Sequence, residues 1–230
     1  KIEDVFTRQA NFSADIAHEI RTPITNLVTQ TEIALSQHRT QKELEDVLYS
    51  SLEEYNRMTR MVSDMLFLAQ ADNNQLIPDR VLFDLGAEVR KVFEFFEAWA
   101  EERHITLTYH GVPCLIEGDP QMFRRAINNL LSNALRYTPT GKTVTVSISK
   151  RGNDVELITE NPGTPIPQVH LSKLFDRFYR VDPSRQRKGE GSGIGLAIVK
   201  SIVTAHHGKV RVESDAVSTR FILTVPGKGL

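Results

Sequence analysis

Two stretches near the start of the chain carry apolar residues at spacings of three and four. The first pattern consists of Phe6, Ile16, Ile20, Ile24, Leu27 and Thr31, with Ala10, Ala17 and Ala34 beside them. The second consists of Leu44, Leu48, Leu52, Tyr55, Met58, Met61, Val62, Met65 and Leu66. This spacing predicts two long amphipathic helices. The polar residues 36–41 between them predict a short connection, so the sequence predicts a helical hairpin.

A two-helix hairpin cannot enclose a core, because each helix leaves an apolar stripe uncovered. Pairing with a second copy into a four-helix bundle would cover both stripes. The alternative is that the hairpin packs on the rest of its own chain.

The pattern changes after residues 72–80, which are polar, carry Pro78 and predict a linker. Helical spacing returns at residues 85–102, 122–137 and 196–207, and strand-like runs lie at 105–110, 143–149, 155–159, 209–212 and 220–225. This order predicts an α+β fold in which helices cover one antiparallel or mixed sheet. The predicted domains are residues 1–71, the linker 72–80 and residues 81–230.

Several local signals mark where these elements begin and end. Asp119 is a candidate N-cap with Pro120 at the first helical position, and Gly208 is a candidate C-cap. His206 and His207 precede Gly208 near the end of a helix, where cationic side chains are favourable.

Composition narrows the class of protein without naming it. Lys and Arg number 28 against 29 Asp and Glu, for a net charge of −1, which argues against direct nucleic-acid binding through bulk electrostatics. Cys114 is the one cysteine, which excludes an internal disulfide framework and favours a reducing compartment. No apolar run approaches the ~20 residues of a membrane helix. Because the chain begins at Lys1 within a helical pattern, we expect a soluble piece of a longer protein.

The first candidate for chemistry is His18, which is followed by Glu19, Thr22 and Pro23. Glu19 can hold one imidazole nitrogen and leave the other free to attack. Thr22 lies one turn further on the same face. Pro23 removes a backbone donor and should bend the helix just past the histidine, at a cost of about 3 kcal/mol. Taken alone, His18 is more simply interpreted as a polar residue on the solvent-exposed face of the helix.

The second candidate lies in the predicted helix 122–137, where Asn129 and Asn133 share one face and Arg136 follows a turn later. Asparagine is mildly unfavourable inside helices, so two on one face indicate a ligand. An amide oxygen suits Mg²⁺, Arg136 could bind phosphate, and Tyr137 could lie on an aromatic ring. A polar helix surface remains the alternative.

The third candidate is the glycine-rich run 188–196, directly before a helix. Glycines at every second position let backbone N–H groups approach a phosphate chain at a helix N-terminus. The dinucleotide-binding fingerprint fails because Leu196 stands where its third glycine belongs, and a Walker loop fails because Arg136 stands at its first glycine.

These three segments, in this order, resemble the H, N and G2 boxes of sensor histidine kinases, and residues 174–180 (LFDRFYR) resemble the F box. The resemblance covers essentially the whole chain. It implies a dimerisation and phosphotransfer hairpin followed by an ATP-binding α/β sandwich of the gyrase, Hsp90 and histidine-kinase type. Residues 175–208 are most similar to copper- and silver-sensing kinases of Gram-negative bacteria.

The resemblance also implies a role for each residue. His18 would be the phosphoacceptor, Glu19 a general base and Thr22 the residue that positions water during dephosphorylation of the partner. Asn133 would be the Mg²⁺ ligand. ATP would be contacted by Asn129, Asn133, Arg136, Tyr137, Asn161, Gly163, Ile166, Arg180, Gly191, Ser192, Gly193, Ile194, Gly195, Leu196 and Thr219.

Two departures from the family pattern concern the base pocket. The family usually has an aspartate that accepts a hydrogen bond from the adenine amino group, and Asn161 stands at that position with Pro165 at a later glycine. An amide oxygen still accepts, but without charge assistance. Glu160 cannot take the role of the missing aspartate, because adjacent residues of a strand face opposite sides of the sheet. The second departure is Ser218, where the family often has glycine before Thr219, and we expect it to be mild.

The resemblance implies a dimeric, ATP- and Mg²⁺-dependent histidine kinase that passes its phosphoryl group to a response-regulator aspartate and also acts as its phosphatase. It further implies that the chain is the cytoplasmic portion of a bacterial inner-membrane protein. Two alternatives stay open: a degenerate nucleotide-binding dimer scaffold, and a gyrase-like ATPase, which would leave residues 18–23 unexplained.

Overall fold

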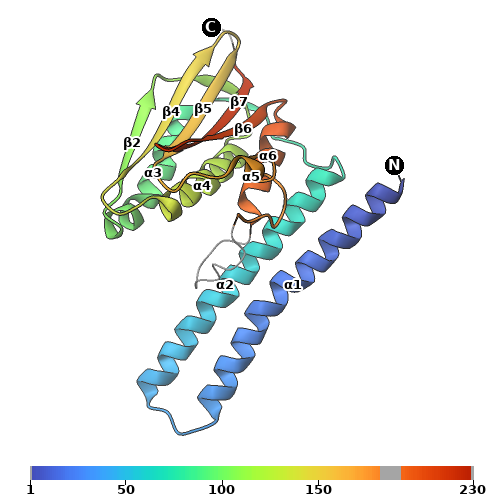
Figure 1. Ribbon diagram of the computed structural model, residues 1–230, viewed down its shortest axis with the longest axis vertical. Coiled ribbons are helices and arrows are strands. Elements are labelled where there is room, and N and C mark those ends of the chain that lie inside the picture. The colour runs from blue at the N-terminus through green and yellow to red at the C-terminus, as the bar shows by residue number, and fades with distance from the viewer. Residues whose placement is uncertain (1, 182–192, 229–230) are drawn as a thin grey trace. The chain divides into compact units, whose positions relative to one another are not determined.

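The computed structural model describes residues 2–181 and 193–228, with side chains from residue 16 onward. The chain divides into two compact units, Lys1–Phe67 and Leu68–Leu230, and each is described by itself. Figure 1 shows the helical hairpin and the sheet-containing unit.

The hairpin consists of α1 (Ile2–Leu35) and α2 (Gln41–Asp72). Pro23 lies inside α1, which continues through it. At the connection, the backbone N–H of Thr40 donates to the Glu43 carboxylate at 2.8 Å, and the N–H of Glu43 donates to the Thr40 hydroxyl at 3.3 Å. This reciprocal capping satisfies two backbone donors at the start of α2. The predicted hairpin is confirmed.

Both helices carry large apolar side chains that the hairpin leaves exposed. On α1 they are Ile24, Val28, Ile33 and Leu35, and on α2 they are Leu44, Leu48, Tyr49, Leu52, Tyr55, Val62 and Leu66. Most recur at three- and four-residue spacing, so they form a stripe along each helix. We call this set the exposed hairpin stripe.

The second unit is built on a mixed five-stranded sheet. Across the sheet its strands are β2 (Thr106–Gly111), β4 (Thr143–Arg151), β5 (Asp154–Asn161), β7 (Thr219–Pro226) and β6 (Lys209–Ser214). β2 pairs with β4 in parallel, and the other neighbours are antiparallel. The hairpin turn between β4 and β5 has Gly152 at φ 63°, as a tight turn there requires.

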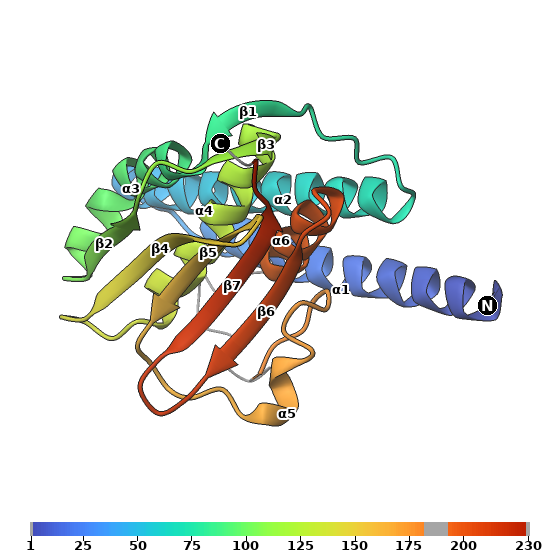
Figure 2. The same ribbon diagram turned by 90° about the horizontal axis from the view of Figure 1, so that it is seen from above.

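Helices α3 (Leu85–Glu102), α4 (Pro120–Tyr137) and α6 (Gly195–Ala205) lie against one face of this sheet (Figure 2). Alternate strand residues such as Val146, Leu157 and Leu223 are buried beneath them. Apolar helix residues such as Leu130 and Ile198 are fully buried on the other side of the same core. The short α5 (Gln168–Leu171) follows β5 in the chain. The α+β sandwich predicted from the sequence is confirmed.

A small sheet escaped the sequence analysis. β1 (Val81–Asp84) pairs antiparallel with β3 (Leu115–Gly118). Asp84 ends β1 and caps α3: one carboxylate oxygen accepts from the N–H of Gly86 at 3.0 Å and of Cys114 at 2.9 Å. Burial raises the pKa of the Asp84 carboxyl, but these hydrogen bonds and Arg90 outweigh burial and hold the pKa below its ordinary value.

The predicted C-cap at Gly208 was wrong. Helix α6 ends earlier, with His206 as its C-cap and His207 in the left-handed region at φ 59°. Gly208 is required for another reason, because a Cβ there would lie 2.4 Å from the Thr224 carbonyl oxygen of β7. His206 is not an exposed side chain at the helix end: it is 4% exposed, and burial lowers the pKa of its imidazole.

Candidate functional site

His18 lies on α1 with its imidazole exposed. Glu19, the next residue, is half-buried and Thr22 is exposed one helical turn further on. Pro23 and Leu27, on the same stretch of the helix, are buried. Because the imidazole of His18 is open to solvent, a separate reacting group can reach it. A buried histidine could not be reached in this way.

A second set of candidate residues follows one face of α4. Asn129, Asn133 and Arg136 are half-buried, and Tyr137 is exposed at the C-terminal end of the helix. The helix begins at Asp119, whose carboxylate accepts from the backbone N–H groups of Gln121 and Met122 at 2.9 and 3.1 Å. The predicted N-cap is therefore confirmed.

The C-terminal end of α4 is held by a residue that the sequence analysis missed. Arg103, directly after α3, donates to the carbonyl oxygens of Leu135 at 2.5 Å and Arg136 at 3.2 Å. These carbonyls lie in the last turn of α4, where backbone acceptors lack helical partners. Arg103 thereby fixes the backbone that carries Arg136 and Tyr137. The signal lay only in tertiary proximity, since Arg103 and Leu135 are 32 residues apart.

Segments distant in sequence converge on α4. A Cβ built on Gly195, the first residue of α6, would lie 3.3 Å from the Asn129 side-chain oxygen. A Cβ built on Gly163, just after β5, would lie 3.1 Å from the backbone oxygen of Tyr137. The start of α6 therefore lies against the Asn129 side chain, and the segment after β5 lies against the C-terminal end of α4. Among the predicted site residues, the structure thus places Gly195 beside Asn129 and Gly163 beside Tyr137.

Asn129 has an amide suited to a ligand. Its Nδ2 is buried and has no hydrogen-bond partner among the residues that the structure describes. A buried amide donor without a partner costs about 1–3 kcal/mol, which a bound acceptor would recover. A phosphate or ribose oxygen at this place would supply that acceptor, so the residues present fit a nucleotide.

The ends of β5 and β7 supply another pair of buried polar side chains. Asn161 and Thr219 are register partners in the two strands and are 4% and 6% exposed. Asn161 Nδ2 donates to the Pro162 carbonyl oxygen at 3.3 Å. The Thr219 hydroxyl contacts the Ser214 hydroxyl at 2.8 Å, and Ser214 Oγ accepts from the backbone N–H of Ile166 at 3.0 Å.

Ser214 is a second residue that the sequence analysis missed. It ends β6 and joins Thr219 to Ile166, two residues predicted to contact the nucleotide. Strand pairing places it there, since Ser214 and Thr219 are register partners across the β6–β7 turn.

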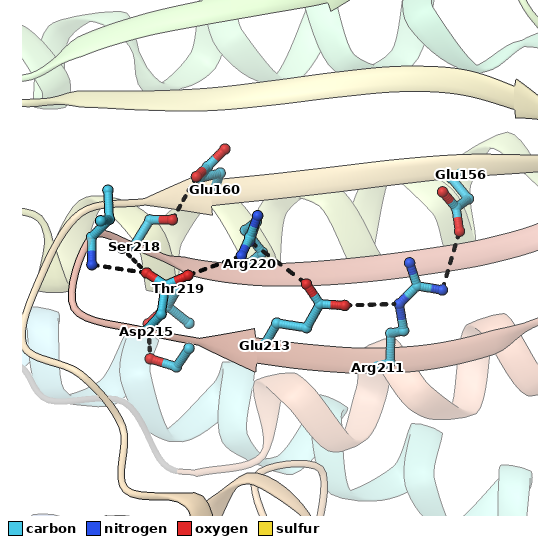
Figure 3. A network of polar contacts seen from close by, with 10 residues as sticks. Glu156, Glu160, Arg211, Glu213, Asp215, Ser218, Thr219 and Arg220 are labelled. Atoms are coloured by element: carbon cyan, nitrogen blue, oxygen red, sulfur yellow. Dashed lines mark hydrogen bonds and ion pairs between the residues drawn. The ribbon is translucent and has the colours of Figure 1, made fainter.

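Glu160 points away from this pair. Its carboxylate accepts a hydrogen bond from the Ser218 hydroxyl at 2.5 Å, and Figure 3 shows both side chains beside the charged residues of the neighbouring strands. Arg220 bridges Asp215 at 3.0 Å and Glu213 at 3.7 Å on the same side. Ser218, expected to be a mild departure, thus binds the carboxylate next to Asn161.

The glycine-rich loop is described only from Gly193 onward; Gly191 and Ser192 lie outside the described residues. Gly193 has φ 73°, and a Cβ there would lie 2.9 Å from backbone atoms of Phe178. The backbone N–H of Phe178 donates to the Gly193 carbonyl oxygen at 3.0 Å. The F-box segment therefore adjoins the loop. Within this segment, the Tyr179 hydroxyl lies 2.6 Å from His170 Nδ1, and Arg180 is half-buried. Ile194 is buried and Leu196 half-buried at the start of α6.

Family comparisons agree with this arrangement. Residues 8–74 match the His Kinase A (phospho-acceptor) domain, and residues 118–229 match the Histidine kinase-, DNA gyrase B-, and HSP90-like ATPase domain. The first match contains His18, and the second contains α4, the ends of β5 and β7, and the glycine-rich loop. The chain belongs to the sensor histidine kinase family, whose members combine these two domains.

Curated relatives match nearly the whole chain. It is 78% identical over 230 residues to the "Probable sensor kinase SilS" of Salmonella typhimurium, and 71% identical over 226 residues to the "Sensor histidine kinase CusS" of Escherichia coli K12. Each alignment covers 98% of this chain but only 46% and 47% of the relatives. The chain therefore spans a little under half the length of these proteins.

Solved structures show the same fold. The Acinetobacter baumannii histidine kinase AdeS matches with a TM-score of 0.77 at 24% identity, over 92% of this chain and 98% of that one. The histidine kinase ThkA, solved in complex with the response regulator protein TrrA, matches with a TM-score of 0.77 at 20% identity, over 99% of this chain and 64% of that one. The predicted fold is thereby confirmed.

Proposed function

We propose that this chain is a histidine autokinase that transfers the γ-phosphoryl group of ATP to His18. The observation that carries the proposal is the exposed imidazole of His18 within a phospho-acceptor domain match, in a chain that also has an ATPase domain match. A degenerate nucleotide-binding scaffold would need no exposed histidine in its helical hairpin.

The chemistry needs few protein groups. One ring nitrogen of His18 would attack the γ-phosphorus, a P–N bond would form, and the bond from that phosphorus to the bridging oxygen would break and release ADP. The proton on the other ring nitrogen would pass to Glu19, the adjacent half-buried carboxylate. Thr22, exposed one turn on, would position water when the partner is dephosphorylated.

The proposed nucleotide site is the α4 face together with the segments that converge on it. Asn129, Arg136 and Arg180 would contact phosphate or ribose oxygens, and Tyr137 would lie against the base. Asn161 and Thr219 would meet the base edge. The remaining contacts would come from Gly163, Ile166, Gly191, Ser192, Gly193, Ile194, Gly195 and Leu196. The proposed boundaries remain residues 1–71 for the phosphotransfer domain, 72–80 for the linker and 81–230 for the ATP-binding domain.

Mg²⁺ would be held through the amide oxygen of Asn133, with waters and phosphate oxygens as its other ligands. The described residues include no group of three or more His, Cys, Asp and Glu side chains that could hold a metal ion. A single amide ligand suits Mg²⁺, which keeps most of its waters and binds mainly through phosphates. The ion would neutralise charge that develops on the transferring phosphate.

Partners follow from the same assignment. A second copy would cover the exposed hairpin stripe and complete a four-helix bundle. Phosphoryl transfer would then proceed to an aspartate of a response regulator that docks beside His18.

We also propose copper or silver as the stimulus, because of the likeness to copper- and silver-sensing kinases. In the part of the chain that the structure describes, no helix is long and apolar enough to cross a membrane; attachment would come from the remainder of a longer protein.

Incubation with Mg²⁺ and γ-labelled ATP tests the proposal. We expect an acid-labile, base-stable label on the chain that His18→Gln abolishes. His38→Gln, which changes an exposed histidine in the hairpin connection, is the matched control and should keep the label. Chelation of Mg²⁺ should also abolish labelling of the unaltered chain.

Three results would contradict the proposal. A label that survives His18→Gln would place the phosphoacceptor elsewhere. ATP binding without any label would favour a nucleotide-binding scaffold. Continued ATP hydrolysis by His18→Gln without labelling of the intact chain would favour a gyrase-like ATPase.

A further inference from the structure

Asn161 and Thr219 form one hydrogen-bonding unit at the end of the sheet. They are register partners in antiparallel strands, so their side chains lie on the same face. That face is the one covered by helices, since Val155 and Leu157 of β5 alternate onto it and are buried. Both side chains are almost fully buried, and the base of a nucleotide at the proposed site would meet them together.

Asn161 offers a hydrogen-bonding edge that can be reversed. Its Nδ2 donates to the Pro162 carbonyl oxygen at 3.3 Å, which leaves Oδ1 as the acceptor for an incoming group. Rotation of the amide by half a turn would exchange the two atoms and cost this one long hydrogen bond. An aspartate at the same position has acceptors on both oxygens and offers no such choice.

Thr219 is reversible for a similar reason. Its hydroxyl and that of Ser214 lie 2.8 Å apart, and either can be the donor. When Ser214 donates, the Thr219 proton is free to be given to the base; when Thr219 donates, its lone pairs face the base. Ser214 accepts from the N–H of Ile166 in both cases, so its position is held while the proton moves.

The Glu160 carboxylate does not determine which atoms of Asn161 and Thr219 donate and which accept. Glu160 lies on the opposite face of β5 and accepts from the Ser218 hydroxyl at 2.5 Å (Figure 3). Asp215 accepts from the backbone N–H groups of Val217 and Ser218 at 2.8 and 3.0 Å, which holds its pKa below the ordinary value. Both carboxylates therefore accept hydrogen bonds from residues of the β6–β7 turn.

We propose that Asn161 and Thr219 together admit purine nucleotides of both hydrogen-bonding polarities, so that the kinase accepts 6-oxopurine triphosphates besides ATP. This inference rests on the proposed nucleotide site. Adenine has a 6-amino donor next to an N1 acceptor, which pair with the Asn161 oxygen and the Thr219 proton. Hypoxanthine has a 6-oxo acceptor next to an N1–H donor, which pair with the Asn161 nitrogen and a Thr219 lone pair.

An aspartate at position 161 would instead place a carboxylate against the 6-oxo oxygen. Two acceptors would then face each other in a buried site with no proton between them. An unmade hydrogen bond involving a charged group costs about 1.5–3 kcal/mol, or roughly ten- to a hundredfold in affinity. Asn161 removes that penalty, so the substitution changes base selectivity as well as the affinity for ATP.

Inosine triphosphate is the diagnostic probe, because its base carries the 6-oxo group without the bulk of the 2-amino group of guanine. Dissociation constants for ATP and inosine triphosphate are measured with Mg²⁺ on the intact chain and on Asn161→Asp. We expect the two constants to lie within about tenfold of each other for the intact chain. For Asn161→Asp we expect their ratio to rise by at least about tenfold, through loss of inosine triphosphate binding.

Glu160→Gln is the matched control. It removes a carboxylate one residue away, on the opposite face, and a glutamine oxygen can still accept from Ser218. The ratio should stay at that of the intact chain. Retained ATP binding by Asn161→Asp also shows that this variant is folded.

The outcomes separate the inference from the function on which it rests. If ATP binds and inosine triphosphate is excluded equally by the intact chain and Asn161→Asp, the inference is wrong and the nucleotide site stands. If neither nucleotide binds the intact chain, the proposed function itself is wrong. A rise in the ratio for Glu160→Gln equal to that for Asn161→Asp would also overturn the inference, because the charge of the segment and not the amide of Asn161 would then set selectivity.

Discussion

The Nε2 atom of His206 accepts a hydrogen bond of 3.0 Å from the backbone N–H of Asp119, 87 residues earlier in the chain. The other ring nitrogen lies 2.7 Å from the Ile202 carbonyl oxygen and must donate to it. His206 is therefore a neutral imidazole with its proton on Nδ1. It joins the C-terminal end of α6 to the N-terminal end of α4, the two helices that meet at the proposed nucleotide site.

This arrangement predicts a stability that falls in mild acid. Burial lowers the pKa of His206, and Arg80 and His207 add to the effect, while Ile202 and Asp119 oppose it. Since the folded-state pKa lies below that of the unfolded chain, about 6.5, unfolding takes up a proton between these two values. The contribution of His206 is thus complete above about pH 6.5 and is lost as the pH falls toward the folded-state pKa.

Urea unfolding followed by the fluorescence of Trp99, the one tryptophan in the chain, measures this effect in the second unit. We expect His206→Leu to lower the free energy of unfolding by about 1–3 kcal/mol at pH 7.5, and by less at pH 5.5. His110→Gln, which alters an exposed histidine on β2, should follow the unaltered chain at both values. The His206 ring also lies against that of Phe123, with the ring centroids 4.6 Å apart. An equal loss at both pH values would mean that this packing, and not titration, accounts for the role of His206.

Gly208 provides a test of close packing between α6 and β7. A Cβ at this position would lie 2.4 Å from the Thr224 carbonyl oxygen and 2.7 Å from a methyl group of Val203. Because one of these atoms belongs to the backbone, it cannot move aside without disturbing the strand. We expect Gly208→Ala to destabilise the second unit by about 1–3 kcal/mol, measured through Trp99. Gly141→Ala is the comparison: a Cβ there has open space, although its φ of 77° leaves a backbone cost. A smaller loss for Gly208→Ala than for Gly141→Ala would contradict the argument.

The helix boundaries and Gly208 also show what sequence patterns can and cannot predict. Periodicity gave α3 at residues 85–102, and the Asp119–Pro120 signal gave the start of α4, because both depend on residues close together in the chain. Gly208 was assigned to the wrong role because the atom that requires a glycine belongs to Thr224, on another strand. The β1–β3 pairing was missed because each strand has four residues, too few to show a period.

The candidate site divides in the same way. His18, Asn129 and Asn133 were found because each stands in a local pattern of helix spacing. Arg103 and Ser214 were missed because their partners, Leu135 and Thr219, are brought to them by tertiary packing or strand register. Sequence therefore predicted the groups proposed to touch the nucleotide better than the groups that hold them in place.

The exposed hairpin stripe predicts association of two chains. Leu52 is 55% exposed and Leu48 68% exposed on the same face of α2. We expect Leu52→Glu to shift the chain toward monomer by at least tenfold in dissociation constant, because burial of a carboxylate in the bundle is unfavourable. Analytical ultracentrifugation over a concentration series measures the shift. Asp46→Lys, a charge reversal on the opposite face of α2, should leave association unchanged, and a monomeric intact chain would refute the prediction.

Arg103 predicts a link between the end of α4 and nucleotide binding. Its guanidinium donates to the carbonyl oxygens of Leu135, Arg136 and Thr138, at 2.5, 3.2 and 3.5 Å. Arg103→Met keeps the apolar stem but leaves these acceptors without the donor, so we expect a loss of about 1–3 kcal/mol in stability. Because the same carbonyls belong to the turn that carries Arg136 and Tyr137, we also expect ATP affinity to fall several-fold under conditions in which the variant is fully folded. Arg103→Lys, which can donate to one or two of the carbonyls, should recover part of both losses. A stability loss with unchanged ATP affinity would restrict Arg103 to capping α4 and separate that cap from the nucleotide site.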